Sequence, residues 1–100
     1  MSQPNPQQII VYSTTWCGDC RRSKRWLKDN NIPFTEIDIE QDAPAADHVR
    51  QLNHGSATVP TIVFPDGAIL VEPSNAALAL QVEKSLGTAT PDAERARSKQ

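Results

Sequence analysis

Residues 14–24, which read TTWCGDCRRSK, contain both cysteines of this 100-residue chain. Cys17 and Cys20 are separated by two residues, a spacing found in zinc sites, in structural crosslinks and in redox couples that open and close. The spacing alone is compatible with all three, so the surrounding residues must discriminate among them.

The sequence on either side of the pair predicts a strand that passes into a helix. The β-branched run 9–12 (IIVY) is typical of a short buried strand. Residues 18–31 contain no proline and carry a basic outer face, so they predict a helix that ends before Pro33. Cys17 would then lie where the strand ends and the helix begins.

The rest of the chain predicts two more helices and three more strands. In order, we expect a strand over 34–40, a helix from Asp42 to Gly55, a hairpin of strands 61–64 and 68–71 around Pro65-Asp66-Gly67, and a helix from Ser74 to Gly87. The inner faces of the last two helices are expected to be Ala45, Val49 and Leu52, and Leu78, Val82 and Leu86. The sum is an α/β fold of order β-α-β-α-β-β-α, with a four-stranded mixed sheet flanked by three helices. Residues 1–87 form the predicted domain, and residues 88–100 a polar C-terminal tail.

Composition narrows the classes of partner and compartment. One hundred residues fit one domain, and a net charge of −2 gives no broad reason to expect nucleic acid or an anionic membrane as a partner. The opening residues 1–8 have no positive cluster and no long apolar run, so neither a signal peptide nor a membrane span is expected there, and we expect a cytoplasmic monomer. In that reducing compartment a single cysteine pair is more typical of catalysis or metal binding than of a permanent crosslink.

A cysteine at a helix N-terminus is suited to nucleophilic attack. The free backbone N–H groups and the positive end of the helix dipole stabilise a thiolate, which lowers the thiol pKa from its free value of about 8.5. Cys17 is therefore the predicted nucleophile, and Cys20, in the first helical turn, the buried thiol that resolves the mixed disulfide. Asp19 opposes this effect, because a nearby carboxylate disfavours a second negative charge. The basic residues that follow favour a thiolate, although such a run is commonly only a solvated helix face.

A zinc site needs two further ligands, and His48 and His54 are the available nitrogens. The gap from Cys20 to His48 is about twice that of the usual finger, and both histidines fall on a predicted helix. Surface histidines are the better interpretation, and no metal is expected.

The pair also has a partner motif far along the chain. Thr58-Val59-Pro60 stands just ahead of a predicted strand. A CxxC at a helix start followed by Thr-Val-Pro resembles the thioredoxin fold and its glutaredoxin branch, over about residues 8–87. The resemblance implies that the Val59-Pro60 bond is cis and that Thr58, Val59 and Pro60 contact the incoming thiol compound. Trp16 either shields the cysteines within a docking surface or simply packs.

One departure from the glutaredoxin pattern points to the thiol co-substrate. Glutathione-dependent glutaredoxins usually carry a Gly-Gly pair and an acidic residue after the last strand, where this chain reads Val71-Glu72-Pro73-Ser74-Asn75. The stretches VYSTTWCGDC, ATVPTIVFPDG and VEPSNAAL are instead similar to mycoredoxins, whose co-substrate, mycothiol, has a neutral pseudo-disaccharide. Asp19 replaces the aromatic residue common in that group.

The resemblance implies a thiol-disulfide oxidoreductase that reduces mixed disulfides between mycothiol and proteins, and other protein disulfides, without a tightly bound cofactor. Its expected partners are mycothiol and mycothiolated or disulfide-containing proteins. One alternative is a redoxin that passes electrons from thioredoxin reductase to ribonucleotide reductase, although the Trp-Ser-Gly-Phe-Arg-Pro stretch of that group is absent. Another is a noncatalytic module that binds zinc or a protein through the CxxC.

Overall fold

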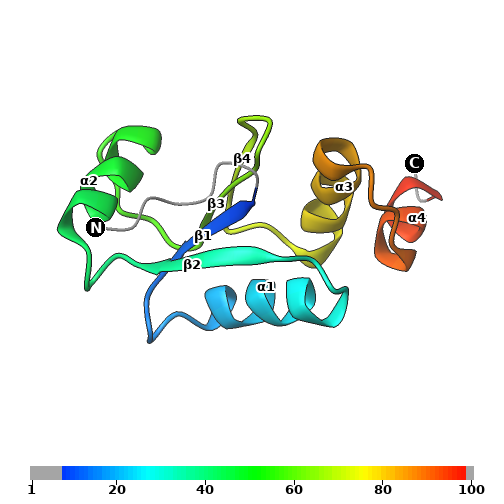
Figure 1. The fold of residues 1–100 in the computed structure, drawn as a ribbon, viewed down its shortest axis with the longest axis horizontal. Coiled ribbons are helices and arrows are strands. Elements are labelled where there is room, and N and C mark those ends of the chain that lie inside the picture. Colours follow the sequence, from blue (N-terminus) through cyan, green and yellow to red (C-terminus); the bar gives the residue numbers. More distant parts are fainter. Residues whose placement is uncertain (1–7, 99–100) are drawn as a thin grey trace.

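The computed structural model describes residues 8–98, and the chain ends included in the predicted domain and tail, 1–7 and 99–100, lie outside the described residues. Four strands form one mixed sheet in the order β2-β1-β3-β4 (Figure 1). The elements are β1 (Ile9–Ser13), α1 (Gly18–Asp29), β2 (Phe34–Asp38), α2 (Ala43–Leu52), β3 (Thr61–Val63), β4 (Ile69–Val71), α3 (Asn75–Leu86) and α4 (Pro91–Ser98). The predicted sheet and the order of its first seven elements are confirmed. None of the helices within 8–98 is long and apolar enough to cross a membrane.

The strand pairing brings several chain turns to one edge of the sheet. β1 runs parallel to β2 and antiparallel to β3, so Tyr12 pairs with Ile37 on one side and Thr61 on the other. β4 is antiparallel to β3, with Val71 opposite Thr61. The carboxyl ends of β1, β2 and β4 therefore lie beside the amino end of β3.

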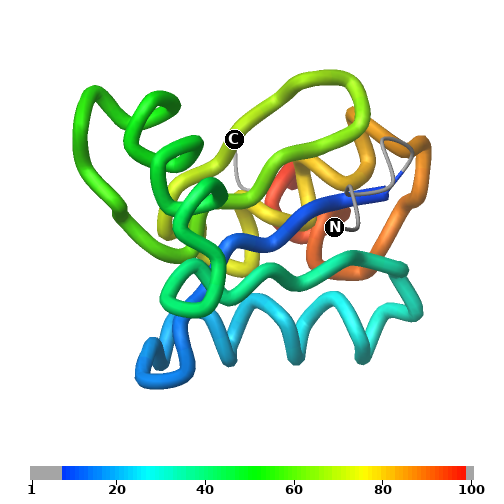
Figure 2. Tube along the Cα trace, turned by 60° about the vertical axis from the view of Figure 1, so that its left-hand side comes forward, coloured from blue at the N-terminus to red at the C-terminus, as the bar shows by residue number. Residues whose placement is uncertain are grey.

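Two layers of helix cover the sheet. α1, α3 and α4 contribute to the larger core, and α1 runs alongside β2 in both ribbon and tube views (Figures 1 and 2). The fully or nearly buried members of this core include Val11, Ile62, Trp26, Leu27, Leu78, Val82 and Ala93. α2 covers part of the opposite face, where Tyr12, Ile39, Ala46 and Val49 form a smaller core.

Local signals at the helix ends are confirmed. The Asp42 carboxylate accepts a hydrogen bond from Ala45 N at 3.0 Å, and Ser74 Oγ accepts one from Ala77 N at 3.1 Å. Gly87 ends α3 in the left-handed conformation, with φ of 72°, where a residue without a Cβ is favoured.

The inner faces of these two helices differ in part from the prediction. On α2, Ala46 and Val49 are buried, while Ala45 and Leu52 are only half-buried. On α3, Leu86 is exposed at its last turn. Val49 is therefore confirmed as an inner-face residue of α2, while Ala46 is more deeply buried than the predicted Ala45 and Leu52.

The segment predicted to be a polar tail contains a fourth helix, so the expectation of three helices was wrong. Thr90 Oγ1 accepts a hydrogen bond from Ala93 N at 3.2 Å at the start of α4, and Ala93 is fully buried against the main core. Trp26 Nε1 donates to the Asp92 carboxylate and ties α4 to α1. α4 has a short apolar face and is otherwise mostly charged, so its sequence shows little helical periodicity. An isolated helix of this length is marginal in water, and α4 is therefore stabilised by packing against the rest of the domain.

Candidate active site

The candidate site lies where four loops meet at the edge of the sheet. These loops join β1 to α1, β2 to α2, α2 to β3 and β4 to α3. Three of them follow strand carboxyl ends and the fourth precedes β3, so the pairing of β1 with both of its neighbours brings them together. This edge holds Cys17, Trp16 and Thr58-Val59-Pro60, the residues that the sequence singled out.

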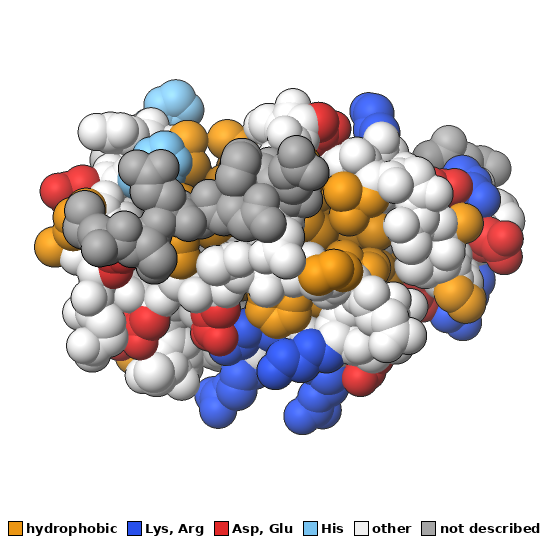
Figure 3. Space-filling model, viewed as in Figure 1, with side chains coloured by type: hydrophobic (Ala, Val, Ile, Leu, Met, Phe, Trp, Pro, Cys, Tyr) orange, Lys and Arg blue, Asp and Glu red, His pale blue; other side chains and the backbone are white. Residues whose placement is uncertain are grey.

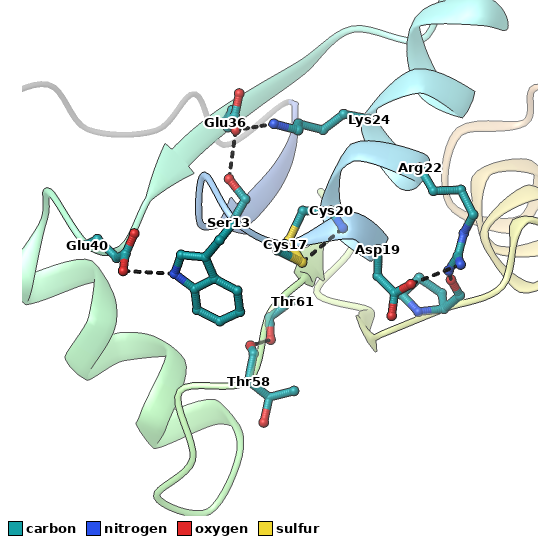
Figure 4. Close-up of a disulfide and its surroundings, with 12 residues drawn as sticks. Ser13, Cys17, Asp19, Cys20, Arg22, Lys24, Glu36, Glu40, Thr58 and Thr61 are labelled. Atoms are coloured by element: carbon teal, nitrogen blue, oxygen red, sulfur yellow. Dashed lines mark hydrogen bonds and ion pairs between the residues drawn. A yellow bond between two sulfur atoms is a disulfide. The ribbon is translucent and has the colours of Figure 1, made fainter.

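Cys17 is the N-cap of α1. Its Sγ accepts a hydrogen bond of 3.0 Å from the backbone N–H of Cys20, as a capping side chain does (Figure 4). The two cysteines form a disulfide with their Cα atoms 5.2 Å apart. Cys17 is 6% exposed and Cys20 is fully buried, so the predicted order of accessibility is confirmed.

This geometry supports different roles for the two sulfurs. When the disulfide is reduced, Cys17 Sγ lies at the positive end of a helix of 12 residues and beside a backbone N–H, both of which favour its thiolate. Cys20 lies behind it, away from solvent. Cys17 is thus the more accessible of the two sulfurs, and Cys20 lies within bonding distance of it.

Asp19 lies at the surface beside the pair and is bound by Arg22. Arg22 Nη1 contacts the Asp19 carboxylate at 3.0 Å, and Arg22 Nη2 donates to the carbonyl oxygen of Pro73 at 2.9 Å (Figure 4). The guanidinium thus offsets the charge expected to oppose the Cys17 thiolate. It also links α1 to the loop before α3.

Trp16 is a surface residue. Its side chain is 66% exposed, and its Nε1 donates to the Glu40 carboxylate at 2.9 Å. Glu40 comes from the loop after β2, so one hydrogen bond holds the indole between two of the four loops. Of the two interpretations left open by the sequence, simple packing in the core is excluded.

The Val59-Pro60 peptide bond is cis, as the resemblance implied. Pro60 is buried, and its carbonyl oxygen accepts a hydrogen bond from Glu72 N at 2.9 Å. Thr61 Oγ1 donates to the Thr58 carbonyl at 2.7 Å and accepts from Asn53 Nδ2 at 3.0 Å. The turn before β3 is therefore held from both sides.

Comparisons with known proteins agree with this geometry. The family model described as Glutaredoxin matches residues 9–69. The chain belongs to the glutaredoxin family. Over 66 residues it is 46% identical to a Mycobacterium tuberculosis protein whose name assigns it to the glutaredoxins, covering 66% of this chain and 79% of that one. It is also 31% identical to Mycoredoxin 1 of Corynebacterium glutamicum over 75% of this chain and 92% of the relative.

A solved glutaredoxin from Archaeoglobus fulgidus has the same fold. It superposes with a TM-score of 0.63 over 82% of this chain and 88% of its own, at 18% identity. The described part of the chain is thus a thioredoxin-like, glutaredoxin-type domain. Membership of the family makes the chain a thiol–disulfide redox protein with a Cys-x-x-Cys pair.

Two features near the site of this glutaredoxin were missed from its sequence. Glu36 of β2 accepts hydrogen bonds from Ser13 Oγ, at 2.7 Å, and from Lys24 Nζ, so β1, β2 and α1 are joined just behind the cysteines (Figure 4). The bond from Lys24 is the main reason that the pKa of Glu36 is lowered. Period-two alternation indicated that Glu36 faces outward, but nothing local indicated which residues it binds.

The second feature is a polar hollow of about 510 Å³ between the start of α1 and the loop before α3, lined by Asp19, Arg22, Glu72, Ser74 and Asn75. Glu72 adopts a left-handed conformation, with φ of 50°, which a residue without a Cβ adopts more readily. The stretch Val71-Glu72-Pro73-Ser74-Asn75 was noted for its departure from the glutaredoxin pattern, but nothing in it indicated that Arg22, 51 residues away in the chain from Pro73, lines the same hollow.

The histidines considered as zinc ligands lie elsewhere. The His48 ring packs near Tyr12, with ring centroids 5.9 Å apart, and His54 follows the end of α2. Across residues 8–98, no group of three or more His, Cys, Asp or Glu side chains is placed to hold a metal.

Proposed function

We propose that this glutaredoxin reduces mixed disulfides between mycothiol and protein thiols. The Cys17 thiolate attacks the mycothiol sulfur, the old disulfide breaks, and the protein thiolate leaves and takes up a proton. The observation that best supports the proposal is the position of Cys17 Sγ as the cap of α1, at the open edge of the site with Cys20 buried behind it.

Two routes complete the cycle. A second mycothiol thiolate can attack the Cys17 mixed disulfide, which releases oxidised mycothiol and needs one cysteine only. Alternatively, Cys20 attacks Cys17 Sγ, expels mycothiol and leaves the intramolecular disulfide, which two electrons must reduce. Those electrons would come from mycothiol and, through a flavin-dependent mycothiol reductase, from the reducing cytoplasm in which we place the protein.

The polar hollow supports mycothiol over glutathione. Asp19 in its lining is paired with Arg22, whereas Glu72 has no salt bridge within residues 8–98, so its carboxylate disfavours the charged carboxylates of glutathione. Its hydroxyl, amide and guanidinium groups are instead suited to the hydroxyls of a neutral pseudo-disaccharide. The similarity to Mycoredoxin 1 points in the same direction.

The remaining contacts to substrate are assigned to Trp16 and to the turn before β3. Within residues 8–98, the backbone N–H and carbonyl of Val59 make no hydrogen bond to another residue, while Thr58 and Pro60 on either side are held in place. We propose that Val59 offers these groups to the backbone of the thiol compound. The exposed Trp16 then covers the opposite side of the bound disulfide.

The test measures turnover of one reporter protein capped with mycothiol or with glutathione. The parent, Cys17→Ser and Cys20→Ser are each assayed with the matching thiol and its reductase, and with thioredoxin reductase as an alternative electron source. We expect a clear preference for the mycothiol cap and no turnover by Cys17→Ser, while activity retained by Cys20→Ser identifies the one-cysteine route. Equal turnover of both caps would refute the mycothiol assignment, and efficient reduction by thioredoxin reductase alone would favour the ribonucleotide-reductase redoxin.

A further inference from the structure

Helix α1 concentrates the positive charge of the chain. It contains five of the ten Lys and Arg residues and two Asp, a net charge of +3. Since the whole chain has a net charge of −2, the residues outside α1 sum to −5. Figure 3 shows Lys and Arg side chains gathered along the lower edge of the molecule, over α1.

Three of these cations form a continuous surface that we call the α1 ridge: Arg21, Arg25 and Lys28. They lie at helical positions i, i+4 and i+7, which share one face and span about 10 Å along the axis. All three are exposed, and with Lys24 and Asp29 they line a shallow hollow of about 270 Å³.

The α1 ridge differs from the other two cations of the helix in having no partner. Arg22 is paired with Asp19 and Lys24 with Glu36, whereas no ridge residue makes a salt bridge with any residue in 8–98. An exposed ion pair contributes little to stability, so leaving the ridge unpaired costs the fold little. Its charges remain free to attract an anionic group.

The α1 ridge begins at the reactive turn. Arg21 N donates to the carbonyl oxygen of Cys17 at 3.3 Å, so Arg21 stands one helical turn beyond the nucleophile. A chain segment lying along the ridge therefore extends toward the position that a capped cysteine must occupy. The polar hollow assigned to mycothiol is separately lined, by residues around Arg22 and the start of α3.

We propose that the α1 ridge docks an acidic segment of the protein substrate and thereby selects which mycothiolated proteins are reduced. The proposal rests on the proposed function and adds the kind of protein partner. A nucleic acid fits less well, because its long run of negative charge would be repelled by the residues outside α1, whose net charge is −5. A short acidic segment meets the hollow along the ridge, where four cations outnumber the single carboxylate of Asp29.

The test compares two peptides of equal length, each with one mycothiol-capped cysteine, flanked by glutamates in one and by glutamines in the other. The ridge variant is Arg21→Gln/Arg25→Gln/Lys28→Gln. Its control, with the same change in net charge, is Arg50→Gln/Lys84→Gln/Arg95→Gln, at exposed positions on other helices. Thermal unfolding verifies that both variants remain folded.

We expect the ridge variant to lose about tenfold in kcat/KM on the glutamate peptide at low ionic strength, and the control variant to lose little. On the glutamine peptide, the kcat/KM of both variants should match that of the parent. The loss of the ridge variant on the glutamate peptide should shrink at high salt, because exposed charges are screened. Equal losses in the ridge and control variants, or an equal loss on both peptides, would overturn the proposal.

A second measurement separates this inference from the proposed function. The same peptides carry an aromatic thiol in place of mycothiol, and they react in a single turnover with proteins that all contain Cys20→Ser. Cys17 attacks the peptide sulfur and forms a disulfide with it, and the coloured aromatic thiolate leaves. A preference for the glutamate peptide that the ridge variant abolishes supports the docking surface even if mycothiol itself is not a substrate. No preference would refute the ridge even if mycothiol turnover is normal. If a single-stranded oligonucleotide competes better than the free acidic peptide, the surface binds nucleic acid and the proposal is wrong.

Discussion

Replacement of each tryptophan by alanine should separate a residue that serves docking from one that serves the fold. Trp16 is 66% exposed, whereas Trp26 is 6% exposed and packed in the main core. A tryptophan buries up to about 250 Å² when fully enclosed, so Trp16 buries about 85 Å² in the free protein. At about 25 cal/mol per Å² this area stabilises the fold by at most about 2 kcal/mol. Trp26→Ala should instead cost about 3–5 kcal/mol, as for other large core side chains.

The exposed part of Trp16 sets the size of its effect on turnover. About 165 Å² remains free, and a docked substrate that covers half of this area gains about 2 kcal/mol. Trp16→Ala should therefore reduce kcat/KM on a mycothiolated protein by about 30-fold. Trp16→Phe should restore most of the loss, because an aromatic face is retained.

The assay pairs urea unfolding with initial rates on a capped reporter protein. The reasoning about Trp16 would be refuted if Trp16→Ala kept kcat/KM within about twofold of the parent. It would also be refuted if the Trp16→Ala and Trp26→Ala variants lost equal free energy of unfolding, because that result would place Trp16 in the core.

Three further predictions follow from contacts near the site. Glu36→Gln should lower the free energy of unfolding by about 0.5–1 kcal/mol at neutral pH, a small value because the carboxylate is partly exposed. Folding lowers the pKa of Glu36, chiefly through the hydrogen bond from Lys24. The stabilisation by the Glu36 carboxylate is therefore present above the pKa of Glu36 in the unfolded chain and is lost as the pH falls through its pKa in the folded protein. Urea titrations of the parent and Glu36→Gln should then give the same free energy of unfolding in acid, and a difference that does not change with pH would contradict this prediction. Asp19→Asn should speed alkylation of Cys17 at neutral pH, more strongly when Arg22→Gln has removed the offsetting guanidinium, and an equal effect in both backgrounds would disprove that offset. Truncation after Gly87 should cost about 2 kcal/mol in urea unfolding through loss of the Ala93 packing and the Asp92 hydrogen bond, whereas a true tail would cost nothing.

The parts of the fold that sequence could predict are those with local causes. Asp42 and Ser74 cap helices because their side chains reach an N–H three residues away, and Gly87 ends α3 because the backbone there needs positive φ. The strand-to-helix unit around Cys17 was predictable for the same reason, since a β-branched run and a helix start lie next to each other in the chain.

The parts that sequence could not predict depend on contacts between distant segments. α4 is held by packing of Ala93 and by the bond between Trp26 and Asp92, which are 66 residues apart. The bond from Arg22 to the Pro73 carbonyl likewise joins loops whose proximity follows only from the sheet order. Trp16 shows a different limit, because a tryptophan before a turn is compatible with both burial and exposure, and only the folded chain decides.

The most direct measurement of the central claim is the rate of alkylation of Cys17 as a function of pH, in the reduced Cys20→Ser variant. If the amino end of α1 stabilises the thiolate, the rate should reach its plateau at a lower pH than that of a cysteine in a flexible peptide of the same local sequence. The difference should vanish when the variant is unfolded in urea. A profile that coincides with that of the free peptide in the folded state would show that Cys17 is not activated, and the proposed exchange chemistry would lose its basis.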